Sequence, residues 1–225
     1  MSDNLLFEFQ GAAILFDMDG TLIDSMAHDE RLWARWAGRH GLDPEPILTI
    51  SHGRRTIETI REVAPHLATE EEFAWFGAQE LEDLEGIRAV DGAAALLRAL
   101  PPQSWALVTS APRRLAEVRM ECAGLALPAV VVSADEVHHG KPDPEGVLRA
   151  ASLLDAAPAE CLVIEDTPAG IQAAHAAGMR ALGITTSYTC EQLGTQPCIA
   201  GFDGFRLLEP KLPGARLHLA LYART

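Results

Sequence analysis

At 225 residues, the chain is long enough to form one large domain or a domain with an insertion. Its 18 basic and 32 acidic residues give a formal net charge of −14, which argues against nucleic acid or an anionic membrane as a partner, because both require a basic surface. The sequence shows neither a signal-peptide pattern nor the roughly 20 apolar residues that a membrane-spanning helix needs.

The first predicted strand, residues 12–17, ends on two carboxylates. Asp17 and Asp19 follow an apolar run, and a glycine and a threonine come next. A short apolar run closed by a turn sequence is typical of a buried strand entering a loop, where open α/β folds bind ligands. Neighbouring carboxylates repel unless they share a proton or a cation lies between them. Mg²⁺ is the cation we expect here, because it prefers oxygen ligands and keeps waters that a phosphate can replace.

Residues from about 25 to 88, the helical insert, are predicted to form a small all-helical unit. Gly41 and the prolines at 44 and 46 are expected to end its first helix, and Pro65 its second. The residues at helical spacing are Leu32, Trp36 and Ala37, then Ile57, Ile60 and Ala64, and finally Phe73, Phe76, Leu81 and Leu84. We interpret Trp33, Trp36 and Trp75 as the core of this unit rather than as ligand contacts.

Predicted strands and helices alternate after residue 88. Strands are predicted at 105–108, 129–132, 162–164 and 181–184, with helices at 93–100 and 112–124, after Asp143–Pro144, and from Thr167 to Gly178. This alternation predicts right-handed βαβ units and a parallel sheet. We therefore expect an α/β fold: a Rossmann-like core with helices on both faces, formed by residues 1–24 and 89–225, and a helical cap formed by 25–88. A pocket is expected between the two.

Three later loops carry polar residues that suit a phosphate. Thr109 and Ser110 follow a predicted strand and offer a hydroxyl and backbone amides near a helix N-terminus. Lys141 offers a compact positive charge in a loop that two prolines stiffen. Glu165 and Asp166 return negative charge to the end of another predicted strand, as expected of a second group facing a metal.

These loops together resemble a known family. The segment DMDGTL at 17–22 is similar to the first motif of the haloacid dehalogenase-like hydrolases, most of which are phosphatases. Thr109–Ser110, GKPDP at 140–144 and EDTPAGIQAA at 165–174 are similar to the second, third and fourth motifs, in the same order. The matches cover most of the chain.

The resemblance implies a role for each motif residue. Asp17 would attack phosphorus, and Asp19 would act as general acid and base while its backbone carbonyl holds Mg²⁺. Thr109 and the Ser110 amide would bind the phosphoryl group, and Lys141 would neutralise it. Asp166 would ligate Mg²⁺, and Glu165 would act on the metal or its waters.

Within this family, several residues bear on the reaction. Asp19 argues against a dehalogenase, which has no second aspartate because a halide leaves without a proton. Residues 25–88 contain no lysine, which argues against a phosphonatase. Mutases of the β-phosphoglucomutase type have a histidine ten residues after the second aspartate; Asp29 stands there, beside His28. This counts against a mutase without excluding one. We expect His28 to be a surface or hinge residue.

The stretch at 50–56 is similar to the Ser-His-Gly-x-Arg-Thr segment of glycerol-phosphate and 2-deoxyglucose-6-phosphate phosphatases. Gly53, Arg54 and Arg55 would then face the cleft and bind phosphate or sugar hydroxyls. The alternative is a helix N-terminus with solvated arginines. His52 either touches substrate or caps the loop. His138 and His139 precede Lys141 without a metal-like partner at useful spacing, so we interpret them as structural.

The sequence thus predicts a Mg²⁺-dependent phosphatase of small sugar or polyol phosphates, acting as a monomer or small homo-oligomer. The enzyme alternative is a sugar-phosphate mutase, and the non-enzyme alternative is a sugar-phosphate sensor that keeps the fold. The cysteines show neither a CxxC pair nor metal-binding spacing, which favours a reduced, cytoplasmic protein; they are Cys122, Cys161, Cys190 and Cys198. Residues after about 190 suggest no chemistry.

Overall fold

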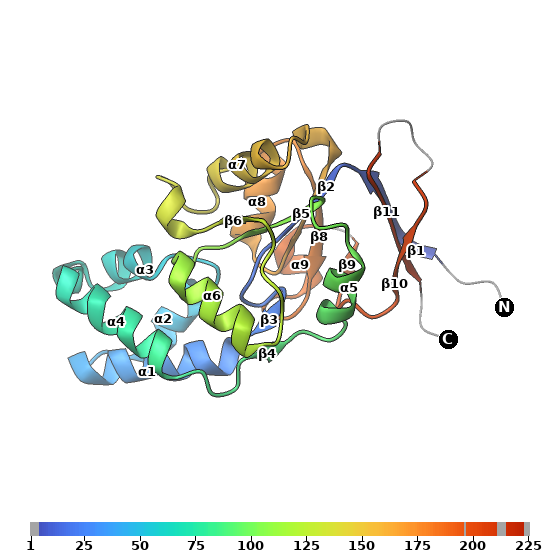
Figure 1. The fold of residues 1–225 in the computed structure, drawn as a ribbon. Coiled ribbons are helices and arrows are strands. Elements are labelled where there is room, and N and C mark those ends of the chain that lie inside the picture. The colour runs from blue at the N-terminus through green and yellow to red at the C-terminus, as the bar shows by residue number, and fades with distance from the viewer. Residues whose placement is uncertain (1–4, 196, 211–214, 223–225) are drawn as a thin grey trace.

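A computed structural model describes residues 5–195, 197–210 and 215–222 (Figure 1). The first half of the chain forms β1 (Leu5–Gly11), β2 (Ala13–Phe16), β3 (Ile23–Asp24), α1 (Met26–His40), α2 (Pro44–Ser51), α3 (Thr56–Val63), η1 (Pro65–Leu67), α4 (Glu70–Glu82), β4 (Arg88–Ala89), α5 (Ala93–Ala99) and β5 (Trp105–Val108). The second half forms α6 (Arg113–Cys122), β6 (Val130–Val132), η2 (Ala134–Glu136), α7 (Glu145–Leu153), η3 (Pro158–Glu160), β7 (Cys161–Glu165), α8 (Pro168–Ala176), β8 (Arg180–Ile184), α9 (Cys190–Leu193), β9 (Cys198–Ile199), β10 (Phe205–Leu208) and β11 (Leu217–Tyr222).

The main sheet is parallel and has six strands in the order β6-β5-β2-β7-β8-β9. β2 lies between β5 and β7, with Ile14 opposite Trp105 on one side and Leu162 on the other. The chain runs from β2 outward to β5 and β6, then crosses to β7 on the other side of β2. This reversal makes the carboxyl end of β2 a topological switch point, where parallel sheets of this type bind ligands. The predicted α/β fold is confirmed.

Helices cover both faces of this sheet, with α7 and α8 on one side and α5 and α6 on the other (Figure 1). Strand residues alternate between the faces, as a pleated strand requires. Ile14 and Phe16 join the core under α5 and α6, whereas Ala13 and Leu15 join the core under α7 and α8. Because both faces are buried, the strands read as continuous apolar runs, which made them predictable.

The helical insert holds α1 to α4 and has its own core. Trp33 and Trp36 are buried, and the Trp33 ring lies 4.5 Å from that of Phe76 between centroids. Trp75 is half-buried, with the Arg39 guanidinium 5.0 Å above its ring. Leu81 is 39% exposed, so its assignment to the apolar face was wrong.

Helix α2 was not predicted. We read the prolines at 44 and 46 as the end of a helix, but Pro44 begins one. Proline is tolerated in the first helical turn, where its missing N–H has no partner to lose. The Asp43 side chain accepts a hydrogen bond from the Glu45 amide at 3.0 Å and caps this helix. The two prolines therefore mark the first turn of α2 rather than a loop.

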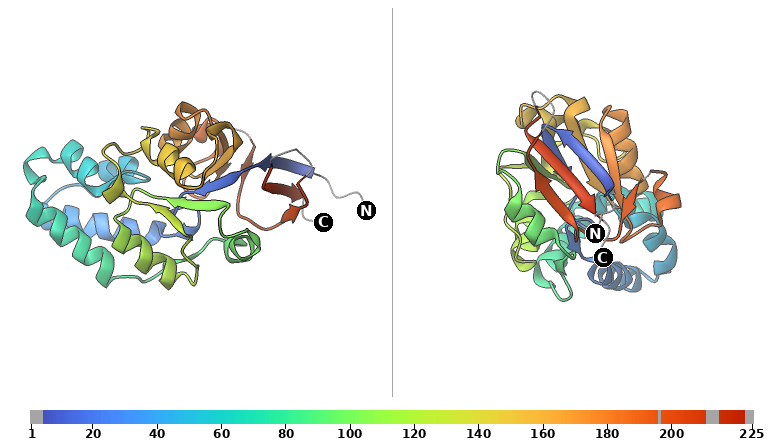
Figure 2. Two further views of the ribbon diagram at one scale, coloured as in Figure 1. Left: turned by 45° about the horizontal axis from the view of Figure 1, so that its top comes forward. Right: turned by 90° about the vertical axis from the view of Figure 1, so that its right-hand side faces the viewer.

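A second, antiparallel sheet of order β1-β11-β10 lies at the end of the molecule opposite the helical insert (Figure 2). β1 precedes β2 almost without a break, so the predicted strand at 12–17 is the inner part of a longer extended segment. The Glu8 backbone pairs opposite Ala220, more than 200 residues away in sequence. Pairing at that separation leaves no local signal, which is why this sheet was missed.

Cys190 and Cys198 form a disulfide, with their Cα atoms 5.8 Å apart. The expectation of wholly reduced cysteines is therefore wrong for this pair. The two cysteines lie at the start of α9 and the start of β9, and eight residues of separation match no familiar signature. Cys161, at the start of β7, is a free and buried cysteine. Within the described ranges, every helix is too short or too polar to cross a membrane.

Candidate active site

The predicted motif residues meet at the carboxyl ends of the central strands. Asp17 follows β2, Thr109 follows β5, and Asp166 follows β7, and all three are buried. Parallel neighbours end at the same edge of a sheet, so these side chains face one opening. A cavity of about 430 Å³ lies there, lined on the core side by Asp17, Asp19 and Asp166 and on the insert side by Trp33 and Phe76.

A tight turn after β2 positions Asp17 and Asp19. The Met18 carbonyl accepts hydrogen bonds from the amides of Thr21, Leu22 and Ile23 at 3.2, 2.9 and 3.0 Å. Gly20 has a φ of +79°, and a side chain there would overlap the Asp166 carboxylate. Glycine is required at this position for both reasons. The turn thereby brings the first motif against the fourth.

Asp17, Lys141, Glu165 and Asp166 form what we call the strand-end cluster. The Lys141 ammonium lies 2.5 Å from an oxygen of Asp17 and 2.7 Å from an oxygen of Glu165. The second oxygen of Glu165 accepts the backbone amides of Asp166 and Thr167 at 2.5 and 2.9 Å. Gly170 lies so close to Glu165 that a side chain there would overlap its carboxylate. Glu165 is thus held by the backbone and fixes the lysine beside Asp17.

The charges in this cluster shift one another. Burial raises the pKa of Asp17 to about 7, although Lys141 acts in the opposite direction. Burial also raises the pKa of Asp166 well above its usual value, and the Glu165 and Asp17 carboxylates add to the rise. Burial alone would raise the pKa of Glu165, but Lys141 and the Thr167 amide bring it below its ordinary value. When Asp17, Glu165 and Asp166 are all ionised, Lys141 therefore compensates only part of the negative charge of the cluster.

The cluster suits a divalent cation. Asp17, Glu165 and Asp166 each offer a carboxylate oxygen, and these atoms lie within 4.8 Å of one another. Thr21 donates to Asp166 at 3.3 Å, and the Ser187 hydroxyl donates to its other oxygen. Hard oxygen donors with adjacent hydroxyls match the preference of Mg²⁺. Glu165 already accepts hydrogen bonds from two backbone amides, the Thr167 hydroxyl and the Lys141 ammonium. Asp17 and Asp166 are therefore the better candidates for direct metal ligands.

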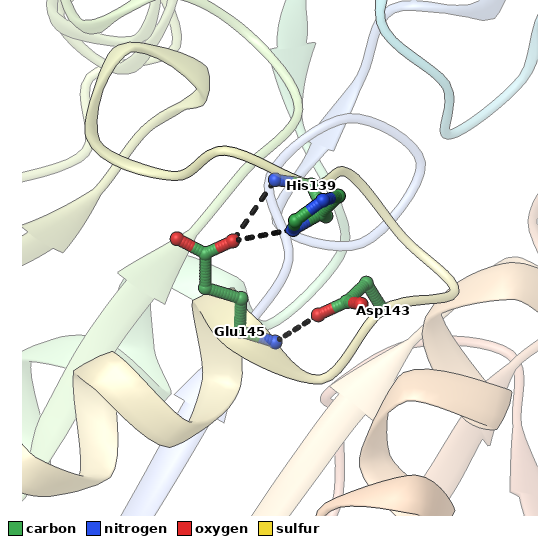
Figure 3. A group of neighbouring side chains, drawn as sticks. All are labelled: His139, Asp143 and Glu145. Carbon is green, nitrogen blue, oxygen red and sulfur yellow. Dashed lines mark hydrogen bonds and ion pairs between the residues drawn. The ribbon is translucent and has the colours of Figure 1, made fainter.

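The loop that carries Lys141 is organised by Glu145. This carboxylate accepts the backbone amide of His138 at 2.9 Å. It also accepts the His139 amide at 2.9 Å, and Asp143 accepts the Glu145 amide (Figure 3). We expected no metal-like partner for His139, which is wrong: ligand atoms of His139, Asp143 and Glu145 lie within 4.8 Å of one another. His139 and Asp143 are exposed, and the contacts in Figure 3 account for the arrangement as loop structure.

Thr109 and Ser110 lie where the second motif was expected. The Thr109 hydroxyl accepts the Ala111 amide at 3.0 Å, which fixes the turn after β5. The Ser110 hydroxyl donates to the Gly53 carbonyl at 2.8 Å, so it bridges the core to the helical insert. The Ser110 side chain is therefore already used in this arrangement.

The loop at 52–55 in the insert lines the cavity and docks on the core. Gly53 has a φ of +73°, and a side chain there would overlap Thr167. Arg55 donates to the carbonyls of His138 and Val137 at 3.3 and 3.2 Å, and Arg54 pairs with Glu62 at 2.7 Å. Both guanidiniums are thus engaged within the protein. His52, Arg54 and Arg55 still line the cavity.

A second charged group, which we call the arginine cluster, consists of Arg119, Asp19, Asp29 and Glu80, and it was not predicted from the sequence. Arg119 on α6 is 3% exposed and lies 2.7 Å from Asp19, 2.8 Å from Asp29 on α1 and 3.8 Å from Glu80 on α4. The sequence did offer one indication of this cluster. Arg119 lies on the same face of α6 as the apolar residues Leu115, Ala116 and Met120. An arginine on a buried helix face needs anionic partners.

His28 belongs to the surroundings of this cluster. It is 1% exposed, and its Nδ1 lies 2.9 Å from Asp29 and 3.2 Å from Arg119. The expectation of a surface or hinge residue is therefore wrong. Helix α1 turns this face toward the core, which a count of residues after Asp19 could not reveal. Ser187 and Thr186, which donates to the Gly20 carbonyl, were also missed.

The chain is similar in sequence to known phosphatases and in fold to known structures. Hexitol phosphatase A of Escherichia coli K12 is 42% identical over 175 residues, covering 76% of this chain and 81% of that protein. Glycerol-1-phosphate phosphohydrolase 2 of Saccharomyces cerevisiae is 34% identical over 199 residues, and the match covers 83% of this chain and 79% of the yeast protein. A β-phosphoglucomutase structure from Clostridium difficile has a TM-score of 0.73 at 21% identity, covering 85% of this chain and 91% of that one, and shares the fold.

A family model described as a haloacid dehalogenase-like hydrolase matches residues 12–178. That range includes the central strands, the helical insert and both charged clusters. The chain therefore belongs to the haloacid dehalogenase-like hydrolase family.

Proposed function

We propose that this protein is a Mg²⁺-dependent phosphatase that hydrolyses small sugar or polyol phosphates through an aspartyl-phosphate. The observation that carries the proposal is the strand-end cluster, in which a buried Asp17 lies 2.5 Å from Lys141 at the edge of the cavity. The names of the two relatives support the substrate class, since one is a hexitol phosphatase and the other acts on glycerol 1-phosphate.

Asp17 is the nucleophile in this proposal. Its carboxylate attacks phosphorus in line with the leaving oxygen, which divides one displacement into two easier ones. Lys141 neutralises charge on the phosphoryl oxygens, and Thr109 and the Ser110 amide donate hydrogen bonds to them. Asp17, Asp166 and the Asp19 carbonyl would hold Mg²⁺, with Glu165 orienting Lys141 and facing the metal waters. When bound, Mg²⁺ supplies positive charge that lowers the cost of bringing an anionic phosphate to Asp17.

Asp19 is the general acid and base. It protonates the leaving alkoxide in the first step and takes a proton from the water that attacks the aspartyl-phosphate in the second. Its carboxylate faces Arg119, and the acidic group of Asp17, Glu165 and Asp166 among the described residues does not include it. That placement supports a proton-transfer role for the side chain rather than metal ligation.

The helical insert, 25–88, serves as a lid over the core formed by 1–24 and 89–225. Its contacts from Arg55 and Gly53 to the core support a closed position that excludes bulk water. Its cavity wall combines Trp33, Phe73 and Phe76 with polar groups such as His52 and Arg54. Aromatic and hydrogen-bonding surface of this kind suits the carbon skeleton and hydroxyls of a polyol or sugar.

The test is phosphate release from a panel containing glucitol 6-phosphate, glycerol 1-phosphate, 2-deoxyglucose 6-phosphate and hexose phosphates, with Mg²⁺ and with EDTA. We expect release from at least one sugar or polyol phosphate, with loss in EDTA and in Asp17→Asn. An isomer as product, together with a requirement for a bisphosphate activator, would replace the proposal with a sugar-phosphate mutase. Tight binding with no release in Mg²⁺ would replace it with a sensor.

A further inference from the structure

We propose that Arg119 is a positioning residue that aims the Asp19 carboxylate at the leaving group and does so fully only when the helical insert is closed. The inference rests on the proposed function, because it concerns the proton donor of that reaction. Arg119 is given no contact with the phosphoryl group in this proposal and acts through Asp19.

The first support is the direction of the Arg119 side chain. α6 packs on the sheet through Leu115, Ala116 and Met120, and Arg119 extends from the same face into the cavity wall. One terminal nitrogen donates to Asp19 at 2.7 Å and the other to Asp29 at 2.8 Å. The planar guanidinium therefore fixes the two carboxylates at a set separation, which a flexible ammonium cannot do.

The second support is that this arrangement is a costly way to stabilise a fold. Burying an arginine with carboxylates is often no more stabilising than an apolar contact of similar size. The Arg119 Nε is buried and has no hydrogen-bond partner among the residues that the structure describes. A buried donor without a partner costs free energy. The orientation of the guanidinium is therefore better explained by the positions that it gives to the two carboxylates than by a gain in stability.

The third support is the origin of the partners. Asp19 and Arg119 belong to the core, whereas Asp29 and Glu80 belong to α1 and α4 of the insert. Ser25, at the entry to α1, donates to the second oxygen of Asp29 at 3.0 Å. Opening the insert would remove Asp29 and Glu80 from Arg119 and leave the guanidinium with Asp19 as its one carboxylate partner in this cluster, free to turn about that contact. The proton donor is thus held most firmly when the leaving group is enclosed.

The test separates leaving groups that need a proton from one that does not. In single-turnover measurements with enzyme in excess, release of the leaving group reports only the first step. Alkoxides from glycerol 1-phosphate and glucitol 6-phosphate need protonation, whereas p-nitrophenolate from p-nitrophenyl phosphate leaves unaided. General-acid assistance is worth about 10²–10⁴-fold in rate. We expect Arg119→Met to slow release of the leaving group from the better polyol phosphate by about 10²-fold or more. Release from p-nitrophenyl phosphate should be slowed much less. In separate steady-state measurements, KM should change little.

Two further variants secure the interpretation. Arg114→Met lies on the same helix with a 72% exposed side chain and should leave both rates unchanged. Arg119→Lys keeps the charge and suits a case in which Arg119→Met fails to fold; it should show the same selectivity for leaving groups, to a smaller degree. An equal loss on both substrates in a folded variant, or no loss on the polyol phosphate, would overturn the inference. In either case the proposed function stands if Asp17→Asn is inactive and the wild type releases phosphate.

Discussion

The strand-end cluster and the arginine cluster have similar compositions but different constructions. Each places one basic side chain among three carboxylates at the cavity: Lys141 in the first and Arg119 in the second. The first takes all its charged members from the core, although Arg55 of the insert contacts the loop that carries Lys141. The second spans the core and two helices of the insert. We infer that the group proposed to act on phosphorus depends less on closure of the insert than the group proposed to lie near the leaving oxygen.

The two clusters also relieve their excess negative charge differently. In the strand-end cluster, burial and neighbouring carboxylates raise the pKa values of Asp17 and Asp166, a condition that a divalent cation relieves. In the arginine cluster, burial raises the pKa of Glu80 to about 8, so this group carries a proton at neutral pH. Burial would also raise the pKa of Asp29, but Arg119 and His28 lower it to about 2. One cluster thus calls for a metal and the other holds a proton.

The largest expected effect is on Asp17. Asp17→Asn removes the nucleophile while preserving size, so turnover in Mg²⁺ should fall by about 10⁴-fold or more, as for other covalent catalysts. Phosphate release measures the loss, and thermal unfolding checks that the variant folds. Near-normal turnover in a folded Asp17→Asn protein would remove the strand-end cluster from the chemistry.

Lys141→Met should have the next largest effect. Removing one group that neutralises developing charge typically costs about 10²–10³-fold in turnover. Lys141→Arg should restore little, because the planar guanidinium does not fit a position shaped by Asp17 and Glu165 at 2.5 and 2.7 Å. If Lys141→Met kept full activity on the best substrate of the panel, a purely structural ion pair would be the better description.

Metal binding should distinguish the two clusters directly. Mg²⁺ at 100 times its dissociation constant should stabilise the folded protein by about 2.7 kcal/mol, visible as a rise in melting temperature. Asp166→Asn should abolish most of that rise. Asp143→Asn, in the exposed group around His139, is the matched control and should retain it. The reverse pattern would move the metal to the surface loop.

The smallest expected effect on turnover concerns Glu80, whose predicted contribution is to the pH dependence of stability. Its pKa is raised to about 8 from 4.5, so between these values the folded state binds more protons than the unfolded state. The free energy of unfolding therefore falls as pH rises, by at most about 1.4 kcal/mol per pH unit from this group. Glu80→Gln should flatten this fall between pH 5 and 8 and be more stable than wild type at pH 8. Urea unfolding at several pH values measures this, and an unchanged slope would contradict a protonated Glu80.

The contrast between the clusters also explains what could be read from the sequence. Asp17, Lys141 and Asp166 follow apolar strands, and parallel strands in succession bring such positions to one edge. Arg119 has only the weaker signal of an arginine on an apolar helix face, and its partners Asp19 and Asp29 lie 100 and 90 residues away in the sequence. The antiparallel sheet of β1 and β11 was missed for the same reason, because its two strands lie more than 200 residues apart in the sequence. The disulfide between Cys190 and Cys198 is a local contact over eight residues, and it was missed because that spacing matches no familiar signature.

The loop at 52–55 of the helical insert was predictable in part. The sequence left two alternatives for this loop, a wall of the cleft or a helix N-terminus with solvated arginines, and His52, Gly53, Arg54 and Arg55 all line the cavity. It did not reveal that Arg55 donates to core carbonyls or that Gly53 packs on Thr167. Position along the cavity followed from the motif, whereas the partners of each side chain depended on how the insert closes.

The central claim is that Asp17 becomes phosphorylated during turnover, and acid quenching tests it most directly. Enzyme mixed with radiolabelled substrate in Mg²⁺ and quenched within a turnover should carry label on the peptide containing Asp17. That label should be released by hydroxylamine and be absent from Asp17→Asn. Phosphate release at the normal rate with no labelled protein at any quench time, or label on a different residue, would contradict the account.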